Sequence, residues 1–525
     1  NNDTSYLVVY QDRGFSGNPY EAENDRTYSL DVLSQEYPFH GSGDYRKTAF
    51  DVIDSNNTSG CDLKVDSYEI IQGKYTLNGL PATYSDNNKA MTLIINLVDT
   101  RLDLKVQLYY GVFEDEDIIT RAAKITNLGD KKITLSKALS ANLDFLTGDF
   151  DLIHFHGRHA GERTMERTHI EHGAFSICSR RGTSSHQHNP FVILSEHDTT
   201  EHFGNCYGMS FVYSGNFECT AEKDQYGQTR LSMGILSERF NYDLQPNESF
   251  LAPEVIMCFS NSGFETLSHK YHNIIRHNIC RGDYKLKRRP ILINNWEATY
   301  FDFDGEKLYN IAKQASELGV EMMVLDDGWF GTRNDDNQGL GDWWVNEKKL
   351  QGSLREVSEK ICSLGMKFGL WIEPEMVNEN SDLYRNHPDW AFTIPNKKPI
   401  RSRNQLALDF SRKEVVNHIC DSIFKVIDDA KISYIKMDIN RSINDVYSAV
   451  KGNPSEGKIL YNYMLGVYDF MERLLSRYPH ILLESCSGGG GRFDAGMMYY
   501  SPQIWCSDNT DAVSRLHIQY GTSFG

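Results

Sequence analysis

Acidic side chains follow one apolar run after another in the second half of the sequence. They are Asp326, Asp327, Glu373, Glu375, Asp438, Asp508 and Asp511, accompanied by Asn294, Asn295, Lys436 and Asn440. Buried strands rarely end in so many carboxylates unless these bind or react with something. The plainer interpretation is helix capping, which we favour for Asp511 because a helical pattern follows it. Asp327 is followed by Gly328 and Trp329 rather than by a helix, so ligand binding is favoured there.

Tryptophans stand at or beside the ends of the same runs. Four of the seven in the chain do so: Trp296, Trp329, Trp371 and Trp505. Aromatic faces stack on the C–H faces of a sugar, and its hydroxyl groups need both hydrogen-bond donors and acceptors. Carboxylates, amides and an ammonium group supply both. The combination predicts a sugar pocket, in preference to tryptophans that only fill a core.

A phosphate or metal cofactor fits the sequence less well. Four glycines, Gly488 to Gly491, follow the run "LESCS", but a phosphate loop needs Lys and Ser or Thr next, and Arg492 and Phe493 stand there instead. Neither an HExxH nor an EF-hand pattern is present, and Lys436 provides a fixed cation beside Asp438. In "HFHGRH", His154 to His159, we favour exposed or structural histidines over a metal site. We expect no cofactor.

Composition excludes several classes of partner. The formal net charge of −18 over 525 residues argues against nucleic acid and anionic membrane surfaces, which are bound chiefly by Lys and Arg. The ten cysteines include no CxxC pair, so we interpret them as reduced thiols of a cytoplasmic protein. No apolar run approaches the ~18 residues of a membrane span.

The pattern of apolar residues changes near Pro290. Short alternating runs from residue 6 to 259, such as "MTLIINLV" and "FVILSEH", predict antiparallel strands of a β-sandwich. A helical pattern over 264–280 predicts a connecting helix. After Pro290, apolar runs alternate with helical stretches, as parallel βα units do, and chemistry in a barrel of such units gathers at the C-terminal strand ends. We therefore divide the chain into 1–260, a linker helix at 261–285, and a barrel at 286–525.

One apolar run does not fit the alternation of strands and helices. Only one long helical stretch, 415–429, separates "WIEPEMV" from "SYIKMDIN", although "QLALDF" at 405–410 lies before that stretch. A parallel sheet needs a crossover between strands, so we assign "QLALDF" to an excursion after the third strand. "SYIKMDIN" is then strand four and "QIWCSDNTD" strand six.

Five motifs in this order resemble those of bacterial α-galactosidases of glycoside hydrolase family 36. They are "LDDGWFG", "WIEPEMV", "YIKMDIN", "ESCSGGGGRFD" and "WCSDNTDA", preceded by "YSLDVLSQEYP" and "GDYR". The resemblance covers essentially the whole chain. It implies an N-terminal β-supersandwich, a (β/α)8 barrel and a C-terminal β-domain. It also implies hydrolysis, with retention, of terminal α-1,6-linked galactose, as in melibiose and raffinose.

The resemblance assigns roles to residues of this sequence. Asp438 is the nucleophile and Asp508 the general acid/base, a pair that stands roughly 5–5.5 Å apart in retaining enzymes. The remaining implied contacts to galactose are Trp296, Asp326, Asp327, Trp371, Arg403, Lys436, Asn440, Cys486, Gly488 and Trp505. The glycine run would let the backbone approach the sugar where a Cβ atom would intrude on the 2-hydroxyl, and the alternative for some of these glycines is that they serve only the turn into the next helix. "CSDN", at 506–509, departs from the commoner "TSDD", and we infer no change of substrate from it.

Other functions of the same fold are galactosyl transfer and removal of α-N-acetylgalactosamine. The latter needs space for an acetamido group, and Cys486 and Gly488 fit a hydroxyl group better. A catalytically silent sugar-binding protein would lack one carboxylate of the pair, and both are present. Family members are often tetramers, for which "QDRGF" and "ENDRTYSL" are the segments of interest.

The resemblance also bears on the ends of the sequence. Only six of the eight strands of a barrel can be assigned before Gly525, and Asn1 is not preceded by Met. We therefore expect these residues to be a fragment of a longer enzyme. Because an open sheet leaves edges and apolar helix faces uncovered, we expect the fragment alone to aggregate and to be inactive.

Overall fold

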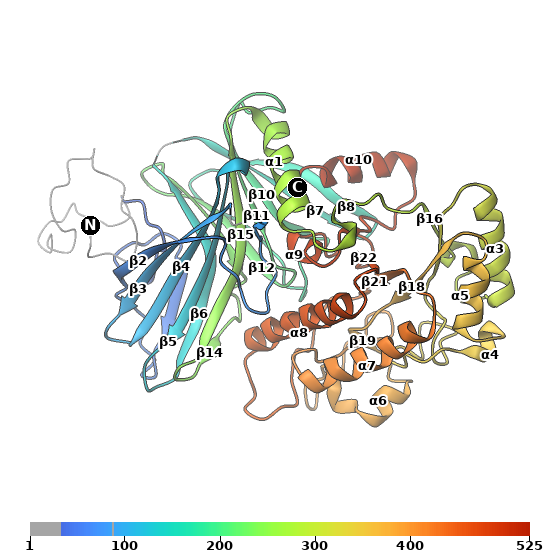
Figure 1. The fold of residues 1–525 in the computed structure, drawn as a ribbon. Helices are drawn as coiled ribbons and strands as arrows, with labels where there is room; N and C mark the ends of the chain where they lie inside the picture. Colours follow the sequence, from blue (N-terminus) through green and yellow to red (C-terminus); the bar gives the residue numbers. More distant parts are fainter. Residues whose placement is uncertain (1–32, 87–88, 147) are drawn as a thin grey trace, which may run out of the picture.

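The computed structural model describes residues 33–86, 89–146 and 148–525 (Figure 1). The first predicted strand, "YLVVY", and the segments "QDRGF" and "ENDRTYSL" lie outside the described residues. Antiparallel sheets occupy one side of the molecule, and a parallel sheet with its helices occupies the other (Figure 1).

Two antiparallel sheets form the first part of the chain. Within the described residues, the larger sheet has nine strands in the order β2 (Lys64–Gln72), β3 (Met91–Asp99), β4 (Leu104–Phe113), β5 (Ile118–Asn127), β15 (Ser249–Ser260), β11 (Cys206–Phe211), β10 (His188–Glu196), β7 (Phe150–Arg158) and β8 (Gly161–His169). The smaller sheet has the order β1 (Phe50–Ile53), β6 (Ile133–Phe145), β13 (Thr229–Ile235) and β12 (Phe217–Lys223). β14 (Tyr242–Leu244) also pairs with β6, and β9 (Gly173–Cys178) packs beside β12.

The two sheets pack face to face through side chains that alternate between buried and exposed positions along each strand. Along β4, Leu104, Val106 and Leu108 are buried, whereas the residues between them are partly exposed. Leu135 and Leu231, from the smaller sheet, belong to the same buried cluster. A period of two residues places one face of each strand in the core, which is why the sequence pattern predicted antiparallel strands correctly.

A helix leads from the sandwich to the parallel sheet. This helix is α1 (Gly263–Asn278), which packs on β15 and β11. The parallel sheet has the order β16 (Leu292–Asn294), β17 (Met322–Leu325), β18 (Lys367–Ile372), β21 (Tyr434–Met437), β22 (Leu482–Ser485) and β23 (Gln503–Ile504). Its helices are α2 (Trp296–Thr299), α3 (Gly305–Glu317), α4 (Glu347–Leu350), α5 (Leu354–Cys362), α6 (Asp382–Asn386), α7 (Lys413–Asp429), α8 (Glu456–Arg477), α9 (Ala495–Met498) and α10 (Ala512–Thr522). Short 3-10 turns lie at Glu114–Glu116, Asp283–Lys285 and Pro388–Trp390.

The strand order confirms the predicted βα arrangement. β21, containing "YIKM", is the fourth strand of the sheet and β23 is the sixth. The run "QLALDF" contributes β20 (Leu406–Ala407), which pairs with β19 (Met376–Val377) in a separate two-stranded sheet. It belongs to the excursion after β18, as predicted. The fold is therefore a β-sandwich followed by parallel βα units of the barrel type.

Capping residues fix where several helices begin. Asp304 starts α3 by accepting a hydrogen bond from the Lys307 amide, and Ser353 starts α5 in a capping box with Glu356. Asp511 accepts from the Ser514 amide, so its prediction as the cap of α10 is confirmed. No helix in the described part of the chain combines the length and apolarity needed to cross a membrane.

The sandwich and the parallel sheet are packed directly on each other. Tyr461, on α8, donates its hydroxyl hydrogen bond to the Leu251 carbonyl of β15 at 2.8 Å. A Cβ atom at Gly457 would lie 1.9 Å from the Phe240 carbonyl oxygen, so the backbone of α8 is in direct contact with the sandwich at this glycine. This contact allows loops of the sandwich to reach the C-terminal ends of the parallel strands.

Candidate active site

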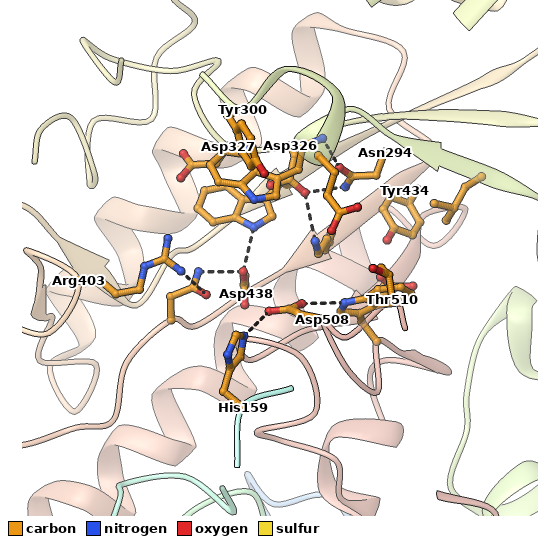
Figure 2. A pocket seen from close by; sticks show the side chains of 18 residues that line it. His159, Asn294, Tyr300, Asp326, Asp327, Arg403, Tyr434, Asp438, Asp508 and Thr510 are labelled. Atoms are coloured by element: carbon orange, nitrogen blue, oxygen red, sulfur yellow. Dashed lines mark hydrogen bonds and ion pairs between the residues drawn. The ribbon is translucent and has the colours of Figure 1, made fainter. Parts of the chain in front are cut away.

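A cavity of about 460 Å³ lies at the C-terminal ends of the parallel strands (Figure 2). All predicted site residues except Cys486 and Gly488 line it: Trp296, Asp326, Asp327, Trp371, Arg403, Lys436, Asp438, Asn440, Trp505 and Asp508. The other residues that line it are His159, Leu292, Asn294, Glu297, Tyr300, Tyr434, Glu484 and Thr510. Residues distant in the sequence meet here because parallel strands end at one edge of the sheet.

Asp438 follows β21 and is surrounded by hydrogen-bond donors. Its Oδ2 accepts from Trp371 Nε1 at 3.1 Å and from Asn440 Nδ2 at 2.8 Å. Its Oδ1 accepts from the Ile439 and Gly488 amides at 2.8 and 3.1 Å. Burial alone would raise the pKa of Asp438, but the Lys436 ammonium and these donors outweigh it and lower the pKa below its ordinary value. The carboxylate is held ionised and in one orientation.

Lys436 connects Asp438 to a second carboxylate. Its Nζ donates to Asp326 Oδ2 at 3.1 Å, and Asn294 Nδ2 donates to the same oxygen at 2.5 Å. Burial would lower the pKa of Lys436, but the charges of Asp326 and Asp438 raise it well above the ordinary value. The ammonium group therefore stays charged beside both carboxylates.

Asp327 is fixed by a buried ion pair. Arg333 Nε and Nη2 donate to its two oxygens at 2.6 and 2.8 Å, and Arg333 is nearly fully buried. A further bond from Arg333 Nη1 to Asn378 Oδ1, at 3.0 Å, fixes the guanidinium group. A paired and immobile carboxylate of this kind can accept hydrogen bonds from sugar hydroxyl groups without reorganisation.

Glu373 binds Asn440, the residue that donates to Asp438. Its Oε1 accepts from the Asn440 amide at 2.6 Å and from Gln405 Nε2 at 2.7 Å, and its Oε2 lies 3.2 Å from Asn440 Nδ2. Burial, together with the charge of Asp438, raises the pKa of Glu373 to about 7. Glu373 thus holds Asn440, which in turn contacts Asp438. Arg403 Nη1 donates to the Asn440 side-chain oxygen at 3.2 Å.

Asp508 follows β23 and faces the same cavity from a more open position. Its side chain is 39 % exposed. Trp505 Nε1 donates to Oδ1 at 2.9 Å, and His159 Nε2 lies 2.9 Å from Oδ2 (Figure 2). A carboxyl group with access to solvent can exchange its proton between catalytic steps.

Trp329 and Cys486 were singled out in the sequence, and neither lines the cavity. Trp329 is fully buried, and its Nε1 donates to the Trp371 carbonyl at 2.9 Å, so it packs beneath the cavity wall. Its prediction as part of the sugar pocket was wrong, because β17 leads it into the core. Cys486 is buried at the end of β22, and burial followed by the charge of Asp438 raises the pKa of its thiol well above the ordinary value.

The glycine run is shaped mainly by protein atoms. Gly488, with a φ of +48°, donates its amide to Asp438. At the next three glycines, a Cβ atom would come within 2.7 Å of the Glu162 carboxylate, 2.5 Å of the Cys506 carbonyl and 2.6 Å of the Ser487 carbonyl, respectively. Protein atoms are thus enough to require glycine at these three positions. Gly489 and Gly490 let the loop pack against the segment that carries Asp508, and Gly491 lets the chain turn close to Ser487.

Glu375, another strand-end carboxylate, has a structural role. Arg492 donates to both of its oxygens, at 3.1 and 2.8 Å, and Tyr463 donates to it at 2.6 Å. Glu375 and Arg492 are both fully buried. This pair anchors the end of the glycine run to the excursion after β18.

Sequence reasoning missed some residues of the cavity wall. Glu484 and Tyr434 lie on the parallel strands themselves, and polar residues at strand ends were a signal that could have found them. His159 belongs to the sandwich, and only exposed or structural histidines were predicted from the sequence of that segment. The contact joins residues 349 positions apart, and no local pattern indicates it.

Outside the cavity, one group of described side chains has the spacing of cation ligands. Asp151, His169 and His197 offer atoms within 4.8 Å of one another, at the end of β7 and β8 opposite His159. However, Arg167 Nε donates to Asp151 Oδ2 at 2.6 Å, and its guanidinium charge opposes a divalent cation there. His169 also donates to Asp151, and that hydrogen bond raises the pKa of His169 above its ordinary value. We interpret the group as an ion-pair cluster.

Comparisons with known proteins identify the family of the chain. The melibiase family model matches residues 249–524, and the model of the glycosyl hydrolase family 36 N-terminal domain matches residues 7–245. The bifunctional α-galactosidase/sucrose kinase AgaSK of Mediterraneibacter gnavus is 58 % identical over all of this chain, which spans 55 % of that relative's length. α-Galactosidase AgaA of Geobacillus stearothermophilus is 50 % identical over 98 % of this chain and 70 % of its own length.

The fold of the chain is also similar to that of a solved structure. A variant of AgaA from G. stearothermophilus, in complex with raffinose, superposes with a TM-score of 0.94 at 49 % identity, over 98 % of this chain and 71 % of its own. The motifs, the fold and both family models thus agree. The chain belongs to glycoside hydrolase family 36.

Proposed function

We propose that the protein is a retaining, exo-acting α-galactosidase that hydrolyses terminal α-1,6-linked galactose from oligosaccharides of the melibiose and raffinose type. The observation that carries the proposal is the pair Asp438 and Asp508, two carboxyl groups in different surroundings that line one polar cavity. Relatives named α-galactosidases, and the raffinose complex of AgaA, support the substrate class.

The polar end of the cavity would bind galactose. Asp326, Asp327 and Lys436 offer fixed acceptors and donors for hydroxyl groups, and Trp296, Trp371 and Trp505 offer faces for stacking. The paired charges are immobilised before the sugar arrives, so binding costs little reorganisation.

In the first step, Asp438 attacks the anomeric carbon as the glycosidic bond breaks. Asp508 transfers its proton to the departing oxygen, and the bond formed to Asp438 gives a covalent glycosyl ester. The donors around Asp438 suit this role because they keep the carboxylate ionised until it reacts. The lowered pKa of Asp438 supports the assignment.

In the second step, water replaces Asp438 at the anomeric carbon. Asp508, now a carboxylate, accepts a proton from the water as the ester bond breaks, which releases galactose with the α-configuration and restores both groups. The partial exposure of Asp508 supports this role, since water must reach it.

The decisive assay compares three substrates of the purified protein. We expect cleavage of nitrophenyl α-galactoside and raffinose, no cleavage of nitrophenyl α-N-acetylgalactosaminide, and α-galactose as the first product in a proton NMR time course. The Asp438→Asn variant serves as the control for contaminating activity. Preferred cleavage of the acetamido sugar, transfer of galactose without its release, or β-galactose as the first product would refute the proposal.

We also propose a cytoplasmic location and a homotetrameric state. All ten cysteines are free thiols, as is usual in a reducing compartment. Edge strand β2 exposes Tyr68 and Ile70 to 70 and 61 %, which favours association through the sandwich. Light scattering of the purified protein tests the oligomeric state, and a monomeric mass at assay concentration would contradict it.

A further inference from the structure

A hairpin of the sandwich reaches into the cavity of the parallel sheet. Strands β7 and β8 form the edge of the nine-stranded sheet, and their turn carries His159 and Ala160. Ala160 has a left-handed φ of +59°, which a residue other than glycine adopts at a cost. In Figure 2, His159 projects from this hairpin toward Asp508.

The hairpin contacts Asp508 directly. Trp505 holds one carboxyl oxygen of Asp508, and His159 Nε2 lies 2.9 Å from the other. The strand before Asp508, β23, is only two residues long, so the parallel sheet alone gives the following loop little support. In the described part of the chain, Asp508 has two side-chain partners. Trp505 belongs to the loop after β23, and His159 belongs to the sandwich.

Both neighbours of Asp508 are also bound to the hairpin. Ser507 Oγ donates to Glu162 Oε2 at 2.6 Å, and Asn509 Nδ2 donates to the Ala160 carbonyl at 2.8 Å. Glu162 is 2 % exposed, and its other oxygen accepts from the Ala160 amide at 3.1 Å. The residues before, at and after the carboxyl group are therefore each tied to the same turn.

We propose that the tip of the β7–β8 hairpin, residues 159–162, positions the acid/base carboxyl group of Asp508, with His159 as the positioning residue. The inference rests on the proposed function. A general acid must hold its proton within hydrogen-bond reach of the leaving oxygen, and small errors of position cost rate. A half-exposed aspartate could rotate about its side-chain bonds, and the hairpin restricts that rotation. The sandwich thereby supplies part of the catalytic geometry.

The test compares His159→Leu with His159→Gln on substrates that differ in their leaving group. Melibiose needs a proton at its leaving oxygen, whereas a nitrophenyl galactoside leaves without much help. We expect His159→Leu to lower kcat/KM, which reports formation of the glycosyl ester, by about 10- to 100-fold on melibiose, part of the effect of a complete general acid, and by less than about threefold on the nitrophenyl substrate. His159→Gln keeps a hydrogen-bonding group near the Nε2 position and should restore most of the melibiose activity.

Controls separate positioning from folding. His202→Leu removes an exposed histidine of the sandwich, paired with Glu265, and should leave both rates unchanged. Melting temperature and inhibition by galactose should match the wild type in both His159 variants. Asn509→Ala removes the amide that binds Ala160 and should give a smaller loss, again larger on melibiose than on the nitrophenyl substrate, which tests the proposal even where His159→Leu fails to fold.

Several outcomes would overturn the inference. Equal losses on both substrates, a glutamine variant as slow as the leucine variant, or no loss on melibiose would each show that the hairpin does not position Asp508. A wild-type protein inactive on both substrates would instead overturn the proposed function, and this inference with it.

Discussion

The two carboxyl groups of the cavity are held in opposite ways. Asp438 is nearly buried and accepts four hydrogen bonds, all from residues of the parallel sheet and its loops. Asp508 is partly exposed and has two partners, one of which, His159, comes from the sandwich. A nucleophile must stay ionised and immobile, whereas an acid/base must exchange protons with substrate and water. The difference in surroundings matches the difference between the two roles that we propose.

The comparison also separates what each part of the chain provides. In the proposed mechanism, the parallel sheet provides the sugar-binding end and the nucleophile from strand-end residues that face one cavity. The sandwich adds a hairpin that contacts the proposed acid/base, Asp508. The close packing of α8 on the sandwich holds the two parts against each other.

Removal of the nucleophile should have the largest effect. Asp438→Ala should lower turnover of every α-galactoside by roughly 10⁴-fold or more, because no other group can form the glycosyl ester. Added azide should restore turnover of the nitrophenyl substrate and produce β-galactosyl azide, measured by mass spectrometry and NMR. Residual activity above about one per cent without azide would argue against this role.

Removal of the proposed acid/base should lower activity much more on substrates with poor leaving groups than on activated ones. Asp508→Ala should lower kcat/KM, which reports formation of the glycosyl ester, by about 10²- to 10⁴-fold on melibiose but far less on nitrophenyl α-galactoside, because the nitrophenyl leaving group needs little protonation. Steady-state rates on the two substrates measure the ratio. The exposed, capping Asp511 provides the matched control, since Asp511→Ala should change stability and not the ratio. Equal losses in Asp508→Ala would mean that Asp508 acts as a cap or spacer.

Removal of the cation beside Asp438 should move the acid limb of the pH profile. Lys436 lowers the pKa of Asp438 against the effect of burial, so Lys436→Met should raise that pKa and shift the acid limb of kcat/KM to higher pH by about one unit or more. The position of the limb is the readout, because lost sugar contacts also lower the rate. Lys313→Met, on the exposed face of α3, is the control. An unmoved limb would show that Lys436 does not tune the nucleophile.

The smallest effect concerns Glu373, behind the nucleophile. Its pKa is about 7 in the folded protein against an ordinary 4.5, so the folded state holds this proton more tightly. Tighter proton binding by folded Glu373 adds to the free energy of unfolding. This contribution is complete below about pH 4.5 and is lost as the pH rises through 7. The melting temperature of the wild type should therefore fall relative to that of Glu373→Gln as the pH rises. The difference between the two melting temperatures should change by about two degrees, in favour of the variant, between pH 5 and 7.5.

The control for this titration is an exposed glutamate. Glu306→Gln, on α3, should keep a constant difference from the wild type over the same range of pH. A constant difference for Glu373→Gln as well would show that Glu373 keeps an ordinary pKa.

Local patterns explain what the sequence could predict. Apolar runs separated by single helices indicated six parallel strands, and the need for a crossover placed "QLALDF" outside them, as the structure confirms. Strand ends meet at one edge of such a sheet, so the order of the runs was enough to group Asp326, Lys436 and Asp438. The cap at Asp511 followed from the helical pattern after it.

Contacts between distant segments were not predictable in this way. The fully buried Trp329 and the cavity-lining Trp371 both stand beside strand ends in the sequence, and only packing separates them. The pairing of Glu375 with Arg492 and the contact of His159 with Asp508 depend on how whole layers dock. Neither contact leaves a periodic or compositional signal.

The most direct test of the account is to identify the residue that becomes glycosylated. A fluorinated α-galactosyl fluoride that forms the glycosyl ester faster than water removes it would be incubated with the protein, followed by proteolysis and peptide mass spectrometry. The account predicts one galactosyl adduct, on Asp438, and its loss in Asp438→Asn. An adduct on Asp508 or on another residue, or no adduct from a protein that cleaves the ordinary substrate, would contradict it.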